Sequence, residues 1–372
     1  MRNGAVLEIN LNQLGINLNC INEAFPTNKV LLMVKADAYG HGIIPITKYA
    51  YENNGIKSFG CATLAEAIYI RNSLEGNFEL FVFSETNLKD ASSKSMYLDF
   101  NIIPVISNIE DFFLITDDLD YKYLPIVLKF NTGMNRLGLE VNELPVIIKQ
   151  LQKHNRDIEH LMSHFACSNL SLENSSNSRQ IKLFNEIKKS LNENNIKFNN
   201  SSISNSGAIE QNYGHDDTFI RPGLLAYGQQ SVMKNNLLKI NWDGDLISSL
   251  KAKVLQIRSV VKGTPIGYGA NPVPNTGTIY ITAIGYGDGF SCSFQSTDFT
   301  YGEKIGKLVG RINMDMCQVL FTEKLNLNKG DWLEFWGKDN SNFESFCKKA
   351  KKIPYEVFCN LSPRLPRVYI KC

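Results

Sequence analysis

Short apolar runs alternate with segments of helical periodicity over the first two thirds of the chain, and this alternation constrains the fold more than any other feature. Strands that alternate with helices are typical of βα units, which build parallel sheets. The expected strands are Val30–Val34, Ser58–Ala62, Glu79–Phe83, Ile102–Ile106, Pro125–Phe130, His160–Ser163, Ser202–Ser204 and Thr218–Ile220. Eight strands within about 200 residues match a (β/α)8 TIM barrel in number and length.

The segments between these strands favour helices. The clearest are Ile43–Asn53, Leu64–Ser73, Glu143–His154 and Ser178–Asn194. In the last of them, Ile181, Phe184, Ile187 and Leu191 recur at helical spacing and mark one apolar face.

The pattern changes in the last third of the chain, where β-rich runs are separated by Gly, Pro and Asn turns. These runs are Lys251–Val261, Thr278–Ile284, Lys304–Val309, Gln318–Phe321 and Trp332–Phe335. We therefore expect an α/β fold in two parts, a barrel over residues 12–238 and a mostly β domain over residues 239–372.

Composition narrows the functional classes. A chain of 372 residues with 43% hydrophobic residues can bury a large core. Its eight cysteines form no C-x-x-C pair, and no histidine stands at metal-ligand spacing from them, so we expect no metal site. The 39 basic and 37 acidic residues are well mixed, which argues against a nucleic-acid partner. Neither a signal-peptide pattern nor a run of membrane-spanning length is visible, so we expect a cytoplasmic protein without a membrane partner.

Lys35 directly follows the first predicted strand, in a segment that reads Val-Lys-Ala-Asp-Ala-Tyr-Gly-His-Gly over residues 34–42. Ligands and reactions are placed at the carboxyl ends of strands in α/β folds. A lysine amine there can form a Schiff base with a carbonyl cofactor, and desolvation favours its nucleophilic form. A strand-terminal lysine that extends to water beside a Gly-rich turn is the structural alternative.

The segment over residues 34–42 closely resembles the pyridoxal-phosphate attachment motif of alanine racemases. Further segments resemble later motifs of that family and follow in the same order. They are residues 129–138 (Lys-Phe-Asn-Thr-Gly-Met-Asn-Arg-Leu-Gly), 163–166, 205–206, 221–224, 267–270, 284–289 and 310–315. These segments span nearly the whole chain, so the resemblance to the alanine racemase family extends over its full length. Alanine racemases are fold type III enzymes that use pyridoxal 5'-phosphate.

The resemblance implies an isomerase that interconverts L-alanine and D-alanine and supplies D-alanine for peptidoglycan. The cofactor delocalises the carbanion formed at Cα, and racemisation then needs bases on opposite faces. Lys35 is the implied base for the D enantiomer and Tyr268 the base for the other face. A phenol ordinarily has a pKa near 10, so Tyr268 would need nearby positive charge to act as a base.

The resemblance also implies the binding residues. The cofactor-binding set is Lys35, Tyr39, His164, Asn205, Ser206, Arg221, Gly223 and Leu224. Arg221 is expected beside the pyridine nitrogen, where a guanidinium keeps its proton and leaves that nitrogen unprotonated. The cofactor is then a weaker electron sink, which suppresses transamination and decarboxylation.

For the substrate, the resemblance implies that Arg136 binds the carboxylate and that Met314 and Asp315 reach it from the second domain. Lys129 matches a lysine that is carbamylated in some relatives and orients this arginine. In this family the second domain completes the site of the other subunit of a homodimer, and the first strand of the chain, within residues 1–11, joins that domain.

Two positions depart from the family pattern. Asn313 stands where several relatives have cysteine, and Pro363 stands where many have a tyrosine near the phosphate. A lost phenol would widen the pocket, so racemisation of serine or another amino acid is an alternative to strict alanine specificity. A non-catalytic pyridoxal-phosphate-binding barrel is a second alternative, and a decarboxylase of this fold a third, although it would need an acid in place of Arg221.

Overall fold

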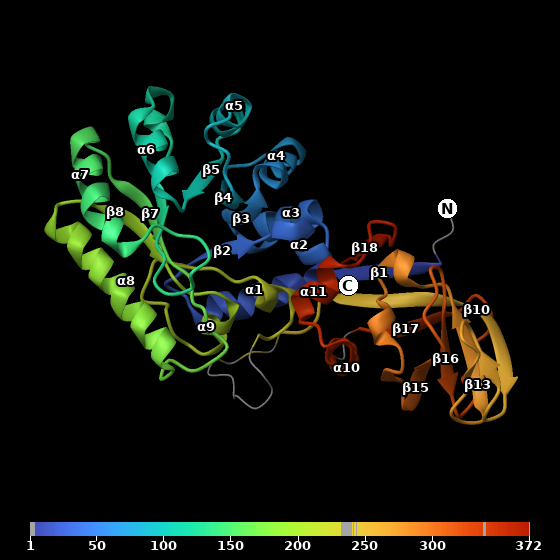
Figure 1. The fold of residues 1–372 in the computed structure, drawn as a ribbon. Helices are drawn as coiled ribbons and strands as arrows, with labels where there is room; N and C mark the ends of the chain where they lie inside the picture. Colours follow the sequence, from blue (N-terminus) through green and yellow to red (C-terminus); the bar gives the residue numbers. More distant parts are fainter. Residues whose placement is uncertain (1–3, 232–239, 241, 243, 338–339, 372) are drawn as a thin grey trace.

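The computed structural model of the chain describes residues 4–231, 240, 242, 244–337 and 340–371. These residues form a parallel α/β barrel and a mostly β domain that lie side by side (Figure 1). The predicted fold class is confirmed. The boundary expected between residues 238 and 239 lies outside the described residues.

The barrel consists of eight parallel strands in the order β8-β7-β6-β5-β4-β3-β2-β9. They are β2 (Lys29–Met33), β3 (Ser58–Thr63), β4 (Glu79–Glu85), β5 (Ile103–Ile106), β6 (Val127–Lys129), β7 (Ile158–Met162), β8 (Phe198–Ser202) and β9 (Phe219–Ile220). A parallel bridge between Asn205 and Arg221 links the ends of β8 and β9, which closes the ring. Each predicted strand overlaps one of these eight in chain order.

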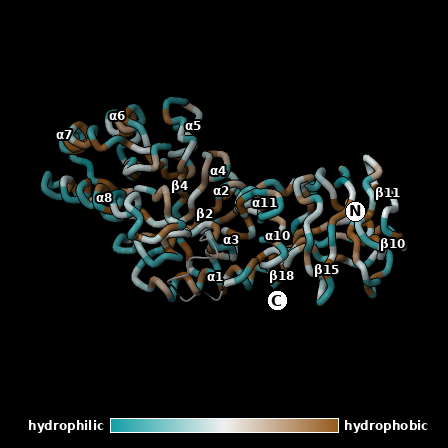
Figure 2. Tube along the Cα trace, turned by 60° about the horizontal axis from the view of Figure 1, so that its bottom comes forward, coloured by the Kyte–Doolittle hydropathy of each residue, from teal (hydrophilic) through white to brown (hydrophobic). Residues whose placement is uncertain are grey.

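Helices surround the barrel strands (Figure 1). They are α1 (Leu11–Ala24), α2 (Lys35–Gly40), α3 (Ile43–Asn54), α4 (Leu64–Ser73), α5 (Ala91–Asp99), α6 (Ile109–Asp117), α7 (Leu144–His154), α8 (Ser175–Glu193) and α9 (Ser206–Glu210), with 3-10 turns η1 (Leu119–Tyr123), η2 (Val141–Glu143) and η3 (Leu224–Tyr227). The four predicted helices are confirmed as α3, α4, α7 and α8. In Figure 2, α7 and α8 carry both hydrophobic and hydrophilic residues, as amphipathic helices on a barrel do.

The second domain is built on a sheet with the strand order β14-β15-β16-β13-β10-β1-β18, and β17 also pairs with β10. Its strands are β1 (Ala5–Asn10), β10 (Ser248–Val260), β13 (Gly277–Thr282), β14 (Asp298–Tyr301), β15 (Lys304–Val309), β16 (Cys317–Phe321), β17 (Trp332–Trp336) and β18 (Arg367–Ile370), beside a hairpin of β11 (Pro265–Ile266) and β12 (Asn271–Pro272) and the turns η4 (Tyr286–Asp288) and η5 (Cys292–Phe294). The first strand, β1, lies antiparallel to β10 and parallel to β18.

Two helices in the second domain were not predicted, α10 (Asn340–Ala350) and α11 (Pro354–Cys359). Phe343, Phe346 and Cys347 of α10 are all buried, and their spacing of three and four residues is a helical signal. The sequence therefore carried a helical signal for α10, but the signal covers few residues and the helix was missed.

The barrel interior is filled with side chains rather than open. Its cluster of buried residues comprises Leu31, Phe81, Ile103, Val105, Val127, Met162 and Phe219. Such a filled interior is typical of this fold and leaves the strand ends as the place for a site. Among the described residues, no helix has the length and apolar character needed to cross a bilayer.

The two domains meet at the segment that follows Lys35. The Tyr369 hydroxyl donates to the carbonyl of His41 (3.1 Å), and the Arg367 guanidinium donates from Nε to the carbonyl of Gly40 (3.1 Å). Gly40 has φ of +78°, and a Cβ there would lie 2.4 Å from the carbonyl oxygen of Phe358 in α11. Gly40 is therefore required both by its conformation and by the close approach of α11.

Gly40→Ala should lower the free energy of unfolding by about 3 kcal/mol, because left-handed strain and a clash with backbone act together. Gly55→Ala is the matched control, since Gly55 has φ of +66° but no atom within 4 Å of its added Cβ. This control should lose only about 1 kcal/mol. Urea unfolding measures the free energy of unfolding of both variants. Equal losses would show that α11 moves to make room for the new methyl group.

Candidate active site

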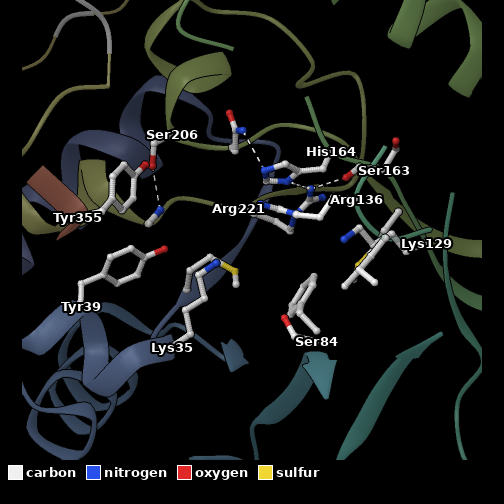
Figure 3. A pocket seen from close by; sticks show the side chains of 16 residues that line it. Lys35, Tyr39, Ser84, Lys129, Arg136, Ser163, His164, Ser206, Arg221 and Tyr355 are labelled. Atoms are coloured by element: carbon white, nitrogen blue, oxygen red, sulfur yellow. Dashed lines mark hydrogen bonds between the residues drawn. The ribbon is translucent and has the colours of Figure 1, made fainter. Parts of the chain in front are cut away.

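A cavity of about 370 Å³ opens at the carboxyl ends of the barrel strands. It is lined by Met33, Lys35, Tyr39, Phe83, Ser84, Lys129, Arg136, Leu137, Met162, Ser163, His164, Asn205, Ser206, Arg221, Gly223 and Tyr355. Figure 3 shows side chains from several parts of the barrel pointing into this space. The cavity has the size and position of a small-molecule site in this fold, and nine of the residues predicted for the site line it.

Lys35 begins a left-handed turn, and Val34 separates it from the end of β2. Residues 36–39 have φ between 52° and 55° and ψ between 40° and 53°, although none of them is glycine. Left-handed conformations cost L-residues about 1–2 kcal/mol each. The turn is therefore strained and has to be held by its surroundings.

Side chains supply two of the bonds that hold this turn. The carboxylate of Glu66 accepts from the backbone N–H of Ala36 (2.7 Å), and that of Asp37 accepts from the N–H of Ile43 (2.8 Å). Burial lowers the pKa of Lys35, and the guanidinium of Arg136 lowers it further. The turn thus presents an amine that releases its proton more easily than an exposed lysine does.

One end of the cavity is lined with hydroxyl and backbone N–H groups. The Ser206 hydroxyl accepts from the backbone N–H groups of Gly223 (2.9 Å) and Leu225 (3.3 Å). A Cβ at Gly223 would lie 2.5 Å from the Tyr39 hydroxyl, so glycine allows that phenol to approach. Leu224, predicted for its backbone, is fully buried at the start of η3 and does not line the cavity with its side chain.

Arg221 is a buried residue of the cavity lining, and several of its donors are bonded within the chain. Its guanidinium donates to the Ser202 hydroxyl and to the carbonyls of Ser163 and Ile203, and it lies 3.3 Å from Nδ1 of His164. Burial lowers the pKa of Arg221 to about 10, so the side chain remains charged at neutral pH.

His164 is neutral in this setting, because burial and the charge of Arg221 hold the pKa of its ring well below the usual value. Nδ1 of His164 faces the Arg221 guanidinium and Nε2 lies 3.3 Å from Nδ2 of Asn205, and both of these partner groups are donors. Because a neutral imidazole has one acceptor nitrogen, the ring accepts from only one of the two at a time.

The cavity is strongly cationic. Lys35, Lys129, Arg136 and Arg221 line it, and no carboxylate is among the lining residues of the described chain. Burial and these neighbouring cations lower the pKa of Lys129 to about 8. The site is therefore suited to a ligand with more than one negative charge.

Three further predicted residues, all in the second domain, lie outside the cavity within this chain. Tyr268 sits between β11 and β12 with 71% of its surface exposed, and Met314 is 52% exposed. Asp315 pairs with Arg364 (2.9 Å). The resemblance assigned these residues to the site of a second subunit, and their exposure in a single chain is compatible with that assignment.

Tyr355 lines the cavity but was not predicted. It extends from α11, and its ring centroid is 5.5 Å from that of Tyr39 (Figure 3). Pro363 is exposed and does not line the cavity. The expectation that a phenol lost at this position widens the pocket is therefore wrong. The second domain supplies a phenol from a different position, and Asn313 also lies outside the lining.

Ser84 was missed as well, although it stands near the end of β4, where the rule that singled out Lys35 applies equally. No cluster of three or more metal-ligating side chains occurs in the part of the chain that the structure describes.

Two family models match the chain. The model described as "Alanine racemase, N-terminal domain" matches residues 9–231, and "Alanine racemase, C-terminal domain" matches residues 247–369. Among curated relatives, the alanine racemase of Clostridium kluyveri is 30% identical over 376 residues, covering 98% of this chain and 93% of that protein. The alanine racemase of Borreliella burgdorferi (strain ZS7) is 30% identical over 379 residues, with 100% and 98% covered.

Solved structures agree over the whole fold. The alanine racemase from Acinetobacter baumannii superimposes with a TM-score of 0.86 at 25% identity, covering 99% of this chain and 100% of that one. The alanine racemase from Bartonella henselae with covalently bound pyridoxal phosphate superimposes with a TM-score of 0.84 at 26% identity, covering 99% of both chains. The two family matches and these relatives together show that the chain is an enzyme and belongs to the alanine racemase family.

Proposed function

We propose that the chain racemises alanine with pyridoxal 5'-phosphate held covalently on Lys35. The observation that carries the proposal is Lys35 itself, a lysine with a lowered pKa in a cationic cavity at the strand ends. When bound, the cofactor supplies an electron sink for the substrate Cα–H bond. D-Alanine for peptidoglycan is the product that we propose for the cell.

The donor set fits the cofactor. Hydroxyls of Tyr39 and Ser206 and the backbone N–H of Leu224 would bind the phosphate, together with the N–H of Gly223, which would share or exchange its present bond to the Ser206 hydroxyl. Tyr355 adds a further phenol at this end of the cavity. The neutral ring of His164, next to Asn205, would pack beside the pyridine ring.

Arg221 would face the pyridine nitrogen. Its guanidinium keeps its protons at neutral pH, since its pKa is about 10, and can only donate. A nitrogen that accepts from it stays unprotonated. This pairing favours racemisation over transamination and decarboxylation, and it argues against the decarboxylase alternative.

Arg136 would bind the substrate carboxylate as a planar bidentate donor. No acidic side chain pairs with it in the described chain, which leaves its charge for a ligand. We further propose that Lys129, whose amine loses its proton readily, adds CO2 to form a carbamate with release of a proton. The carbamate would turn a cation into an anion beside Arg136 and orient it.

The second base would come from another copy of the chain. Lys35 would hold and deliver the proton on one face of Cα, and Tyr268 would reach the opposite face from a partner in a homodimer, with Met314 and Asp315 of the same second domain. The exposure of Tyr268 supports this arrangement. The match to the second domain over residues 247–369 speaks against the single-domain, non-catalytic alternative.

Purified protein supplied with pyridoxal 5'-phosphate should convert L-alanine into D-alanine, measured by chiral chromatography. Lys35→Ala should abolish turnover, and Tyr268→Phe should slow it about 10²–10⁴-fold, as expected for loss of a catalytic base. Tyr69→Phe is the control, because Tyr69 is an exposed tyrosine on α4 outside the cavity. L-Serine in the same assay tests the broader specificity, and turnover of no amino acid would refute the racemase proposal.

Mixing Lys35→Ala and Tyr268→Phe subunits should restore activity. Suppose that each site combines Lys35 of one chain with Tyr268 of its partner. In an equal mixture that pairs at random, about half of the dimers are hybrids, and each hybrid has one intact site of two. The mixture should therefore show about a quarter of wild-type activity. The mixture is refolded or co-expressed and assayed against each variant alone. Continued inactivity of a mixture that forms dimers would place both bases in one chain.

Lys129→Met should stabilise the apoprotein in CO2-free buffer at pH 7 by about 3 kcal/mol. The folded pKa of Lys129 is about 8, below its unfolded value of 10.5, so the unfolded chain binds more protons between these values and wild-type stability should rise with pH across that window. The variant should lack this rise, and bicarbonate should stabilise only the wild type. Urea unfolding at several pH values measures both effects, and identical pH profiles would contradict them.

A further inference from the structure

Glu66 touches the residue next to Lys35 from outside the cavity. It lies in the first turn of α4, and its Oε1 accepts from the backbone N–H of Ala36 at 2.7 Å. Its Oε2 accepts from the N–H groups of Ala62 (2.8 Å) and Thr63 (3.4 Å) at the end of β3. One carboxylate thus ties the start of the left-handed turn to the neighbouring barrel strand.

A helix cap alone does not account for this geometry. Thr63 and Glu66 form a reciprocal capping box, in which the Thr63 hydroxyl accepts from the N–H of Glu66 (3.3 Å) and Oε2 faces the N-cap backbone. The cap uses one carboxylate oxygen. The other oxygen reaches across to Ala36, thirty positions earlier in the chain, where the first donors of a turn otherwise lack a backbone acceptor.

We propose that Glu66 is a positioning residue for Lys35, holding the strained turn in register and placing a negative charge beside the cofactor lysine. The inference rests on the proposed function of Lys35. It adds a residue from the outer helix layer to the catalytic apparatus, although Glu66 does not line the cavity.

The charges around Lys35 make the proposal measurable. Arg136 favours the neutral amine, whereas Cys359 of α11 and Glu66 favour the protonated one, and Lys129 and His164 lie within range of the same amine. Removal of the Glu66 charge should therefore lower the pKa of Lys35. Loss of the hydrogen bond from Ala36 to Glu66 should separately let the turn move. A reaction that needs the Lys35 amine at a fixed position should then be slower.

The test follows cofactor attachment to the apoprotein rather than turnover. Attachment replaces the aldehyde oxygen of pyridoxal phosphate with Nζ of Lys35 and releases water, and visible absorbance reports its rate at each pH. Borohydride reduction and mass spectrometry then locate the modified lysine. Glu66→Gln keeps the shape but cannot accept at both positions, so it should slow attachment at high pH about tenfold and move the pH midpoint downward.

Two variants separate the causes. Glu66→Asp keeps the charge but is one methylene shorter, so it should slow attachment while keeping the midpoint near that of the wild type. Thr63→Ala weakens the same cap but leaves the contact with Ala36, so its melting temperature should fall with no change in rate or midpoint.

The outcomes are distinct. Wild-type midpoint and rate in Glu66→Gln, or an equal change in Thr63→Ala, would overturn the role of Glu66 while leaving Lys35 as the cofactor lysine. Failure of the wild type to attach the cofactor at Lys35 would instead overturn the proposed function, and this inference with it. If Glu66→Gln does not fold, an unchanged attachment rate in Glu66→Asp overturns the positioning role.

Discussion

The left-handed turn after Lys35 is the constraint on which the rest of the site depends. Four consecutive non-glycine residues in this conformation cost about 4–8 kcal/mol, which is comparable to the net stability of a domain. The compensation comes from both domains, through Glu66 at the start of the turn and Arg367 at its end. Arg367 also donates to three carbonyls of its own segment, which hold its guanidinium in place. The second domain therefore helps to support the turn that begins at Lys35.

The charge of the cavity indicates the kind of ligand that suits it. Four cationic side chains converge without a carboxylate in the cavity lining of the described chain, and burial together with neighbouring cations lowers the pKa of Lys35 and Lys129. Bound anions relieve this repulsion, so binding and stability are coupled. The excess of positive charge in the lining therefore suits the site to phosphate and carboxylate groups.

The sequence predicted the barrel well because buried parallel strands appear as apolar runs, and Lys35 stood out because it follows one of them directly. The left-handed turn was not predictable, since Ala-Asp-Ala-Tyr contains none of the glycine that usually marks positive φ. Tyr355 was missed because α11 is short and its contact with Tyr39 joins residues more than three hundred positions apart. Glu66 did not stand out in the sequence, since its bond to Ala36 depends on tertiary structure.

Exposure of Tyr268 and Met314 gives a physical reason for a shared site. The cavity that holds Lys35 lies at the barrel, whereas Tyr268, between β11 and β12 of the second domain, is exposed and does not line this cavity in the same chain. Arg364 pairs with both Asp288 and Asp315, which fixes the backbone around Met314 although that side chain is exposed. In a two-fold dimer a single interface would bring each exposed tyrosine to a partner's cavity, so two complete sites would form from parts that neither chain can bring together alone.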